Sequence, residues 1–273
     1  MNTEVVGSGG VRLGLRVEGL ANTRSLVFVH GWAQSSQAWA PQFADAALVD
    51  EFRLVAMDLR GHGKSDVPVH GYDDSRNWAD DLATVLEFAG PGAIVVGWSY
   101  GGLVLADYLR VHGTAQLAGI VLVGAITEIG RGRAGGRVGP AMRAAMPAAL
   151  SDEPQVAVPA LVTFGEAMTS RPLPGAYAQA LLGSSLSVPP SVRGALFRRD
   201  VGSEDVLAAI DVPALVIHGR NDKIVDPSAG EYAAGKIPGV RARWLEGVGH
   251  LPFAEAPAEF NAELRSFAES SFA

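Results

Sequence analysis

The residues best suited to chemistry surround a serine, in the segment Gly97-Trp98-Ser99-Tyr100-Gly101. An apolar run at 94–96 precedes this segment, and apolar residues at helical spacing follow it. The pattern predicts a strand, a tight turn and a helix, with Ser99 at the apex in a sparsely populated backbone conformation. The helix N-terminus would favour negative charge developing beside the hydroxyl. Ser99 is therefore the candidate nucleophile.

A serine hydroxyl needs a base within reach, and the base needs a third group to orient it. Among the six histidines, His250 lies in a loop directly after the last predicted strand. Imidazole suits the role of base because it titrates near neutral pH. Asp222 lies in the loop after the preceding strand, and Glu128 is an alternative acid after an earlier strand. The chain order Ser99, Asp222, His250 is the order expected of a nucleophile on such a turn.

Acyl transfer also requires hydrogen-bond donors aimed at the forming oxyanion. The backbone N–H of Tyr100, next to the candidate nucleophile, is one such donor. The loop after the apolar run 26–29 would supply the second, and within His30-Gly31-Trp32 the best candidate is the N–H of Trp32. We therefore expect the backbone of Trp32 and Tyr100 to form an oxyanion hole.

The elements that must position these residues alternate between strands and helices. A half-exposed strand is predicted at 11–17 and a helix at 75–89, capped by Asp73, Asp74 or Ser75. Apolar strands are predicted at 26–29, 54–57, 94–96, 120–123 and 214–217, and a last short strand at 241–245. Later helices begin at Pro227, with Asp226 as the N-cap, and at Pro257. This alternation predicts an α/β fold with a mostly parallel twisted sheet flanked by helices.

The alternation is interrupted after residue 126 by a segment rich in glycine, arginine and proline. Short helices are predicted at 142–150, 160–168 and 177–182, and no sheet strand is expected before residue 214. We expect 1–126 and 206–273 to form the core domain and 127–205 to form a helical cap over the carboxyl edge of the sheet.

Composition restricts the partners and the compartment. The net charge of −7 argues against nucleic acid or an anionic membrane surface, so a small-molecule substrate is expected. No cysteine is present, which excludes disulfides, thiolate nucleophiles and cysteine-based metal sites. The first ten residues lack the features of a signal peptide, and no apolar run approaches membrane-spanning length. We expect a cytoplasmic protein whose chemistry uses no cofactor and no metal ion.

Five motifs in this order resemble the α/β-hydrolase family, and most closely its branch of single-domain esterases and cofactor-free haloperoxidases. The motifs are His30-Gly31-Trp32, Asp58-x-Arg60-Gly61-x-Gly63-x-Ser65, Gly97-Trp98-Ser99-Tyr100-Gly101-Gly102, Gly219-x-x-Asp222 and Gly249-His250. The resemblance implies Ser99 as nucleophile, His250 as base and Asp222 as acid, with Trp32 and Tyr100 as oxyanion donors. A serine at position 99 departs from the haloalkane dehalogenase and epoxide hydrolase branches, in which an aspartate attacks.

Other prominent residues are interpreted structurally. We expect His30 to support its loop, and Asp58 and Arg60 to pair with each other. Trp98 and Tyr100 are expected to pack beside the turn. A solvated face is expected for the arginines of the insertion, Arg131, Arg133, Arg137 and Arg143.

The sequence therefore predicts a serine hydrolase that cleaves the carboxylic ester of a small to medium, mostly apolar substrate through an acyl-enzyme. One alternative is a non-hydrolytic enzyme on the same scaffold: a lyase, a cofactor-free oxygenase or perhydrolase, or a biosynthetic cyclisation catalyst. A second alternative is a receptor-like binding protein that has lost catalysis. The oligomeric state is not readable from the sequence.

Overall fold

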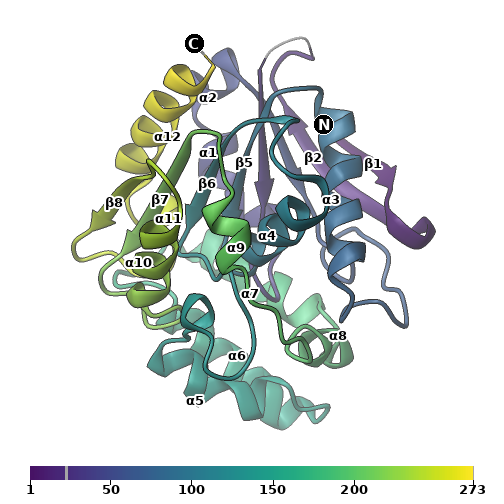
Figure 1. The fold of residues 1–273 in the computed structure, drawn as a ribbon. Coiled ribbons are helices and arrows are strands. Elements are labelled where there is room, and N and C mark those ends of the chain that lie inside the picture. Colours follow the sequence, from purple (N-terminus) through teal and green to yellow (C-terminus); the bar gives the residue numbers. More distant parts are fainter. Residues whose placement is uncertain (22–23, 273) are drawn as a thin grey trace.

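A computed structural model describes residues 1–21 and 24–272. Eight strands form one sheet in the order β1-β2-β4-β3-β5-β6-β7-β8 (Figure 1). The first two pairings, β1 with β2 and β2 with β4, are antiparallel, and all the others are parallel. The strands are β1 (Asn2–Val6), β2 (Arg12–Glu18), β3 (Ser25–Val29), β4 (Arg53–Met57), β5 (Ala93–Trp98), β6 (Leu117–Val123), β7 (Ala214–Gly219) and β8 (Arg241–Leu245). The predicted fold class is confirmed.

The burial of each strand follows its sequence pattern. Every residue of β3, β5 and β7 is buried, as continuous apolar runs covered on both faces should be. The edge strand β1 alternates between exposed and half-buried residues, and the sequence analysis did not predict it. Its weak apolar pattern explains the omission, because only one face of this edge strand packs on the molecule.

Helices cover the sheet in two groups. One group is formed by α3 (Ser75–Ala89), α4 (Tyr100–His112), α9 (Glu204–Ala208) and α10 (Pro227–Lys236), which contact one another in sequence order. The other is formed by α1 (Ala40–Phe43), α11 (Pro252–Glu255) and α12 (Pro257–Ser271), with α2 (Ala46–Glu51) next to α1. Asp74, one of the predicted capping residues, caps α3 through its side chain, and Asp226 caps α10 in the same way.

Between β6 and β7 the described chain contributes no strand to the sheet. Besides α9, four helices of this stretch lie below the sheet in Figure 1. They are α5 (Pro140–Ala149), α6 (Pro154–Ala167), α7 (Gly175–Ser187) and α8 (Pro190–Ala195). The helices expected at 142–150, 160–168 and 177–182 are present and longer than predicted. Three of the four begin with proline, whose fixed φ suits the first helical position. Short 3-10 helices lie at Ser8–Gly10, Ser36–Trp39 and Ala134–Gly136.

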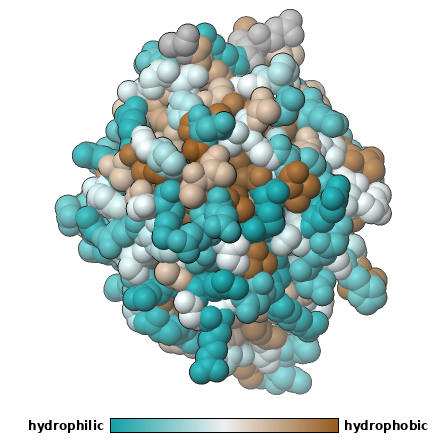
Figure 2. Space-filling model, in the orientation of Figure 1, coloured by the Kyte–Doolittle hydropathy of each residue, from teal (hydrophilic) through white to brown (hydrophobic). Residues whose placement is uncertain are grey.

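The surface is a mixture of polar and apolar residues. Figure 2 shows polar side chains over much of one face, interrupted by small apolar areas. Arg131, Arg133, Arg137 and Arg143 are exposed, as expected, whereas Arg193 and Arg199 of the same segment are buried. Among the described residues, no helix has the length and apolarity that crossing a membrane would need.

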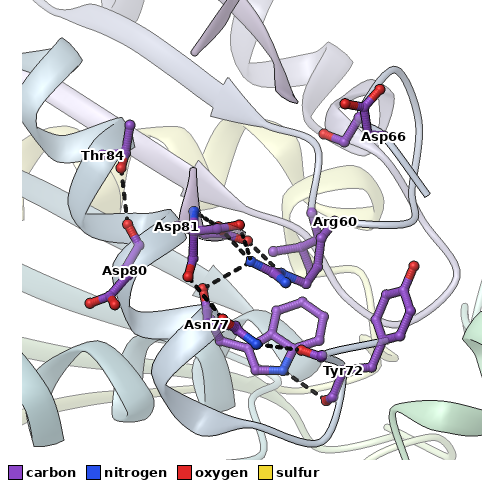
Figure 3. A network of polar contacts seen from close by, with 12 residues as sticks. Arg60, Asp66, Tyr72, Asn77, Asp80, Asp81 and Thr84 are labelled. Carbon is purple, nitrogen blue, oxygen red and sulfur yellow. Dashed lines mark hydrogen bonds and ion pairs between the residues drawn. The ribbon is translucent and has the colours of Figure 1, made fainter. Parts of the chain in front are cut away.

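The expected pairing of Asp58 with Arg60 is wrong. Arg60 instead forms a bidentate ion pair with Asp81 of α3, with N···O distances of 2.7 and 2.8 Å (Figure 3). The Asp58 carboxylate accepts hydrogen bonds from the backbone N–H groups of Ser36 and Lys64, at 2.6 and 2.9 Å. Asp58 and Arg60 therefore anchor the same loop to different parts of the molecule. Their closeness in sequence suggested a pair that the structure does not contain.

The Arg60 and Asp81 side chains are only 2% and 1% exposed. Burial raises the pKa of the Asp81 carboxyl, and the neighbouring Arg60 guanidinium only partly opposes this effect. Ser8 also donates its backbone N–H to Asp81 at 2.8 Å, so the pair links the N-terminal segment to α3. A buried pair of this kind is costly to desolvate and more costly to break on one side.

We predict that Asp81→Leu lowers the free energy of unfolding by about 3–5 kcal/mol, because it leaves the Arg60 guanidinium buried without a counter-charge. The double variant Arg60→Met/Asp81→Leu should lose markedly less. Denaturant titration monitored by circular dichroism measures both values. A double variant less stable than Asp81→Leu would contradict this account of the pair.

Candidate active site

The candidate residues meet because the parallel strands end at one edge of the sheet. Strand β3 pairs directly with β5, so the loop after Val29 lies beside the turn after Trp98. The chain passes from β3 to β4 on one side and then returns to β5 on the other. Such a reversal of strand order opens a crevice at the carboxyl ends of the strands, where open α/β sheets bind ligands.

Ser99 occupies the strained apex of the turn between β5 and α4. Its φ of 55° and ψ of −119° lie in a region that side chains rarely adopt. The turn depends on glycine on both sides. A Cβ on Gly101 would lie 2.3 Å from the Val29 carbonyl oxygen, and a Cβ on Gly97 would lie 2.8 Å from the Gly101 carbonyl oxygen. The predicted strand, turn and helix are present, and the strain that the glycines permit is stored at the serine.

The loop after β3 packs against this serine. A Cβ on Gly31 would lie 2.8 Å from the Cβ of Ser99, so only glycine lets the loop approach so closely. In the described chain, the backbone N–H groups of Trp32 and Tyr100 donate no hydrogen bond to another residue. The Trp32 indole donates to the Arg193 carbonyl at 3.0 Å and fixes the loop to the helices below. Two unpaired backbone donors thus flank the hydroxyl-bearing turn.

His250 and Asp222 form a buried pair. The Nδ1 atom of His250 lies 2.7 Å from Oδ2 of Asp222, and the two side chains are 2% and 0% exposed. Because the carboxylate can only accept, Nδ1 carries the proton and Nε2 of the neutral ring is left free to act as a base. The Trp98 indole donates to the His250 carbonyl at 3.0 Å, so a residue next to Ser99 also fixes the histidine.

The Asp222 carboxylate is held as an anion. Burial by itself would raise its pKa, but electrostatic attraction to His250 and hydrogen bonds from His218 and His250 lower the pKa to about 2. Its Oδ1 also accepts the backbone N–H groups of Ile224 and Val225, at 2.8 and 3.0 Å. The loop after β7 therefore supplies both the Asp222 carboxylate and backbone donors that keep it charged and fixed.

His218 is a member of this cluster that the sequence analysis missed. Its Nε2 lies 3.1 Å from Oδ2 of Asp222 and 3.3 Å from the Val225 carbonyl oxygen, and its side chain is fully buried. Both neighbours are acceptors, so Nε2 must carry a proton. On the other side of the ring, Nδ1 has no partner in the described chain and faces Gly230 of α10. In the sequence, His218 could have been found from its position at the end of a predicted strand, four residues before Asp222.

The alternative acid, Glu128, is engaged elsewhere. Its carboxylate accepts the backbone N–H groups of Gly135 and Ser203, and the Tyr232 hydroxyl, at 2.9 to 3.2 Å. These contacts fasten the two ends of the segment that contains α5 to α8. Asp222, rather than Glu128, is the carboxylate that contacts His250.

His30 links two loops. Its Nε2 accepts the Leu59 N–H at 3.0 Å, while Nδ1 lies 2.8 Å from the Gly31 carbonyl. Burial lowers the pKa of His30 to about 4 and that of the neighbouring His62 to about 3, so both rings stay neutral. This geometry agrees with the supporting role expected for His30.

Ser99 and His250 line the same small cavity, of about 10 Å³. Residues of the insertion close it from below, namely Met142, Phe164 and Met168, together with Trp32 and Ile224. In the described chain the His250 side chain is hydrogen-bonded to Asp222 and not to the Ser99 hydroxyl. Hydrogen bonds between a nucleophile and its base often tighten only when substrate is bound. Ser99 and His250 thus line one small cavity, and Asp222 contacts His250 without lining it.

A buried ion pair connects the turn to the helices below. Arg199, which follows α8, lies 2.6 Å from Asp107 of α4 and donates to the Tyr100 hydroxyl at 3.0 Å. The Tyr100 hydroxyl in turn donates to the Leu196 carbonyl at 3.2 Å. Trp98 and Tyr100 are both buried beside the turn, as expected, and each also fixes a neighbouring segment.

Comparison with known proteins identifies the family. Residues 26–263 match the model of the alpha/beta hydrolase family, and the chain belongs to this family. It is an enzyme of that fold, as the sequence resemblance indicated.

Two relatives and one solved structure illustrate the similarity. A non-heme haloperoxidase of Rhodococcus erythropolis is 31% identical over 265 residues, which cover 90% of this chain and 93% of that protein. A pimeloyl-[acyl-carrier protein] methyl ester esterase of Nitrosospira multiformis is 27% identical, covering 94% and 99%. The crystal structure of esterase RhEst1 from Rhodococcus sp. ECU1013 superposes with a TM-score of 0.95 at 51% identity, and covers 98% of both chains.

The strain at Ser99 predicts an effect on stability. Ser99→Gly should have a free energy of unfolding about 0.5–2 kcal/mol higher than that of Ser99→Ala, because the relief of the strained φ outweighs the larger conformational entropy that glycine loses on folding. Ser99 makes no side-chain cap of α4, so neither variant loses a capping bond. Urea titration of the two purified variants makes the comparison. If Ser99→Gly proves the less stable of the two, the turn is not strained as described.

Proposed function

We propose that this protein is a serine hydrolase that cleaves the carboxylic ester of a small to medium, mostly apolar molecule through an acyl-enzyme. The observation that carries the proposal is the arrangement of Ser99 at a strained turn, in one cavity with a histidine 2.7 Å from a buried carboxylate. This is the residue set that activates a serine hydroxyl.

In the proposed reaction, Ser99 Oγ attacks the ester carbonyl while Nε2 of His250 takes its proton. The N–H groups of Trp32 and Tyr100 stabilise the oxyanion that forms. The imidazolium then protonates the leaving alcohol, and Asp222 holds the ring in position and stabilises its charge. Water attacks the acyl-enzyme by the same sequence in the second half, which releases the carboxylic acid and restores Ser99.

We further propose that 127–205 acts as a cap on a core formed by 1–126 and 206–273. Support comes from Met142, Phe164 and Met168 of this segment, which line the cavity at Ser99. Their apolar side chains favour an apolar substrate over a charged one.

A second candidate activity rests on the names of relatives. The non-heme haloperoxidase of Rhodococcus erythropolis is one of them, and a bifunctional esterase/perhydrolase of Acinetobacter calcoaceticus is 39% identical over 105 residues, 38% of this chain. A perhydrolase would use the same acyl-enzyme but transfer the acyl group to hydrogen peroxide. The lyase and cyclisation alternatives have no such support. The complete set of catalytic residue types speaks against a receptor-like protein without turnover.

We predict that Ser99→Ala lowers kcat/KM for a short ester such as ethyl acetate by about 10³-fold or more, because the acyl-enzyme cannot form. Circular dichroism and the unfolding midpoint serve as the folding control. Turnover retained by a folded Ser99→Ala protein would contradict the proposal.

Hydrolysis in ¹⁸O-labelled water separates the two candidate activities. Incorporation of one solvent oxygen into the acid product supports ester hydrolysis. A peracid product formed faster than the acid when hydrogen peroxide is added would favour the perhydrolase.

We also propose that His218 is a positioning residue for Asp222. His218→Met should lower kcat by about tenfold, because the carboxylate loses a hydrogen bond to a charged group. With fewer donors on Oδ2, more of the negative charge acts on His250, so the acid limb of the pH profile should move upward by about half a pH unit. His218→Gln keeps a donor near the position of Nε2 and should restore most of both properties. Stopped assays across pH 5 to 9 supply the profiles, at roughly the range in which histidine titrates.

The Gln variant distinguishes positioning from packing. If His218→Met and His218→Gln reduce kcat equally and neither shifts the acid limb of the pH profile, His218 only packs in the core and does not position Asp222.

A further inference from the structure

The cavity at Ser99 is too small for any ester. Its volume of about 10 Å³ is close to the minimum that holds one water molecule. Ligand sites for small molecules usually enclose several hundred Å³. A substrate can therefore reach Ser99 only if one of the residues that line the cavity moves. The residue that moves determines in which neighbouring space the remainder of the substrate binds.

A much larger space lies next to it. A groove of about 550 Å³ runs between α6 and α7 and the segment that joins them. Most of its lining side chains are apolar, among them Val162, Leu173, Leu181 and Leu182. The space at Ser99 and this groove have one lining residue in common, Met168.

Met168 is suited to be the moving part of the wall. Its backbone is fixed, because its carbonyl oxygen accepts the His250 N–H at 2.7 Å and its own N–H donates to the Gly165 carbonyl oxygen at 3.3 Å. Its side chain is unbranched and adaptable, unlike the rings of Trp32 and Phe164 elsewhere in the wall. Met168 is therefore the residue at which the two spaces meet.

The groove is also attached to the catalytic loops on two sides. At one end is the Met168 contact with His250. At the other, the Gln34 side chain, two residues beyond Trp32, donates to Ser185 Oγ at 2.8 Å and to the Leu181 carbonyl oxygen at 3.3 Å. The α7 wall therefore lies against the loop that carries an oxyanion donor, and the α6 wall lies against the base.

We infer that the groove between α6 and α7 binds an unbranched apolar chain of the ester, and that Met168 is the gate between this chain and Ser99. This inference rests on the proposed function and specifies its substrate: an ester with one extended alkyl chain and one small group. The small group follows from the bulky residues that fill the other walls of the Ser99 cavity. The chain can belong to the acid or to the alcohol, which an experiment distinguishes.

A glycine in α6 offers a way to fill the groove without straining the backbone. Gly165 lines the groove, and a Cβ built on it meets no atom within 4 Å. Gly165→Leu also replaces a poor helix former with a good one. Gly183 of α7 is a matched control, because it has equal space but does not line the groove.

The test compares kcat/KM for octyl acetate and methyl octanoate with that for ethyl acetate. Gly165→Leu should lower the ratio of long to short ester by about tenfold or more for at least one long ester, since several methylenes lose their burial. The long ester that is affected identifies the part of the substrate that carries the chain. Gly183→Leu should leave both ratios within about twofold of wild type. Unchanged ratios in Gly165→Leu, or equal losses in the two variants, would overturn the inference.

A second pair of variants tests the gate. Met168→Ala should raise the ratio of long to short ester by about threefold or more, because the wall no longer has to rotate. Met142→Ala removes a methionine that lines only the Ser99 cavity, and should not raise this ratio. An equal rise in both variants would show general loosening of the cavity and contradict a gate at Met168.

Failure of the proposed function is separable from failure of this inference. If wild type hydrolyses none of the three esters, the proposed esterase activity is wrong. The groove is then tested by calorimetric titration with octyl acetate. The Ser99→Ala protein should bind it, and the double variant Ser99→Ala/Gly165→Leu should not. Binding of octyl acetate that survives Gly165→Leu would show that the groove does not hold the alkyl chain, and would overturn this inference whatever the enzyme's activity.

Discussion

The tight turn between β5 and α4 is the constraint on which the rest of the site depends. It holds Ser99 at a φ of 55°, and it can form only because Gly101 lets α4 approach the end of β3 closely. Gly31 also packs against Ser99, and the N–H groups of Trp32 and Tyr100 have no partner among the residues that the structure describes. Strain in the backbone thus accompanies a hydroxyl that faces a small buried cavity beside two backbone donors, and strained backbone of this kind is common at functional sites.

The Asp222 carboxylate is fixed in a different way, by the several hydrogen bonds that it accepts. Asp222 is buried beneath His250, where an unsupported carboxylate would be protonated. Donors from its own loop and from His218 and His250 keep it charged, and they also fix the direction in which it orients the imidazole. Two contacts therefore position His250. Its ring is hydrogen-bonded to the Asp222 carboxylate, and its backbone carbonyl accepts the Trp98 indole N–H, which joins the loop after β8 to the turn after β5.

The sheet, its flanking helices and the residues now grouped at its edge could be predicted because each leaves a local pattern. Buried strands are continuous apolar runs, and loops that follow parallel strands share one edge. The partner of Arg60 could not be predicted, since Asp81 reaches it only through the packing of α3 on the sheet. The closure of the Ser99 cavity by Met142, Phe164 and Met168 was equally hidden, because helix packing in the insertion depends on contacts far apart in sequence.

The central claim is that His250 activates Ser99, and the rate of covalent labelling tests it most directly. A fluorophosphonate reacts with an activated serine, and peptide mass spectrometry locates the adduct. The account predicts one rapid adduct, on the peptide that contains Ser99, with a rate that falls by about 10²-fold or more in His250→Ala. An adduct on another serine, or labelling of Ser99 at an unchanged rate without His250, would contradict the account.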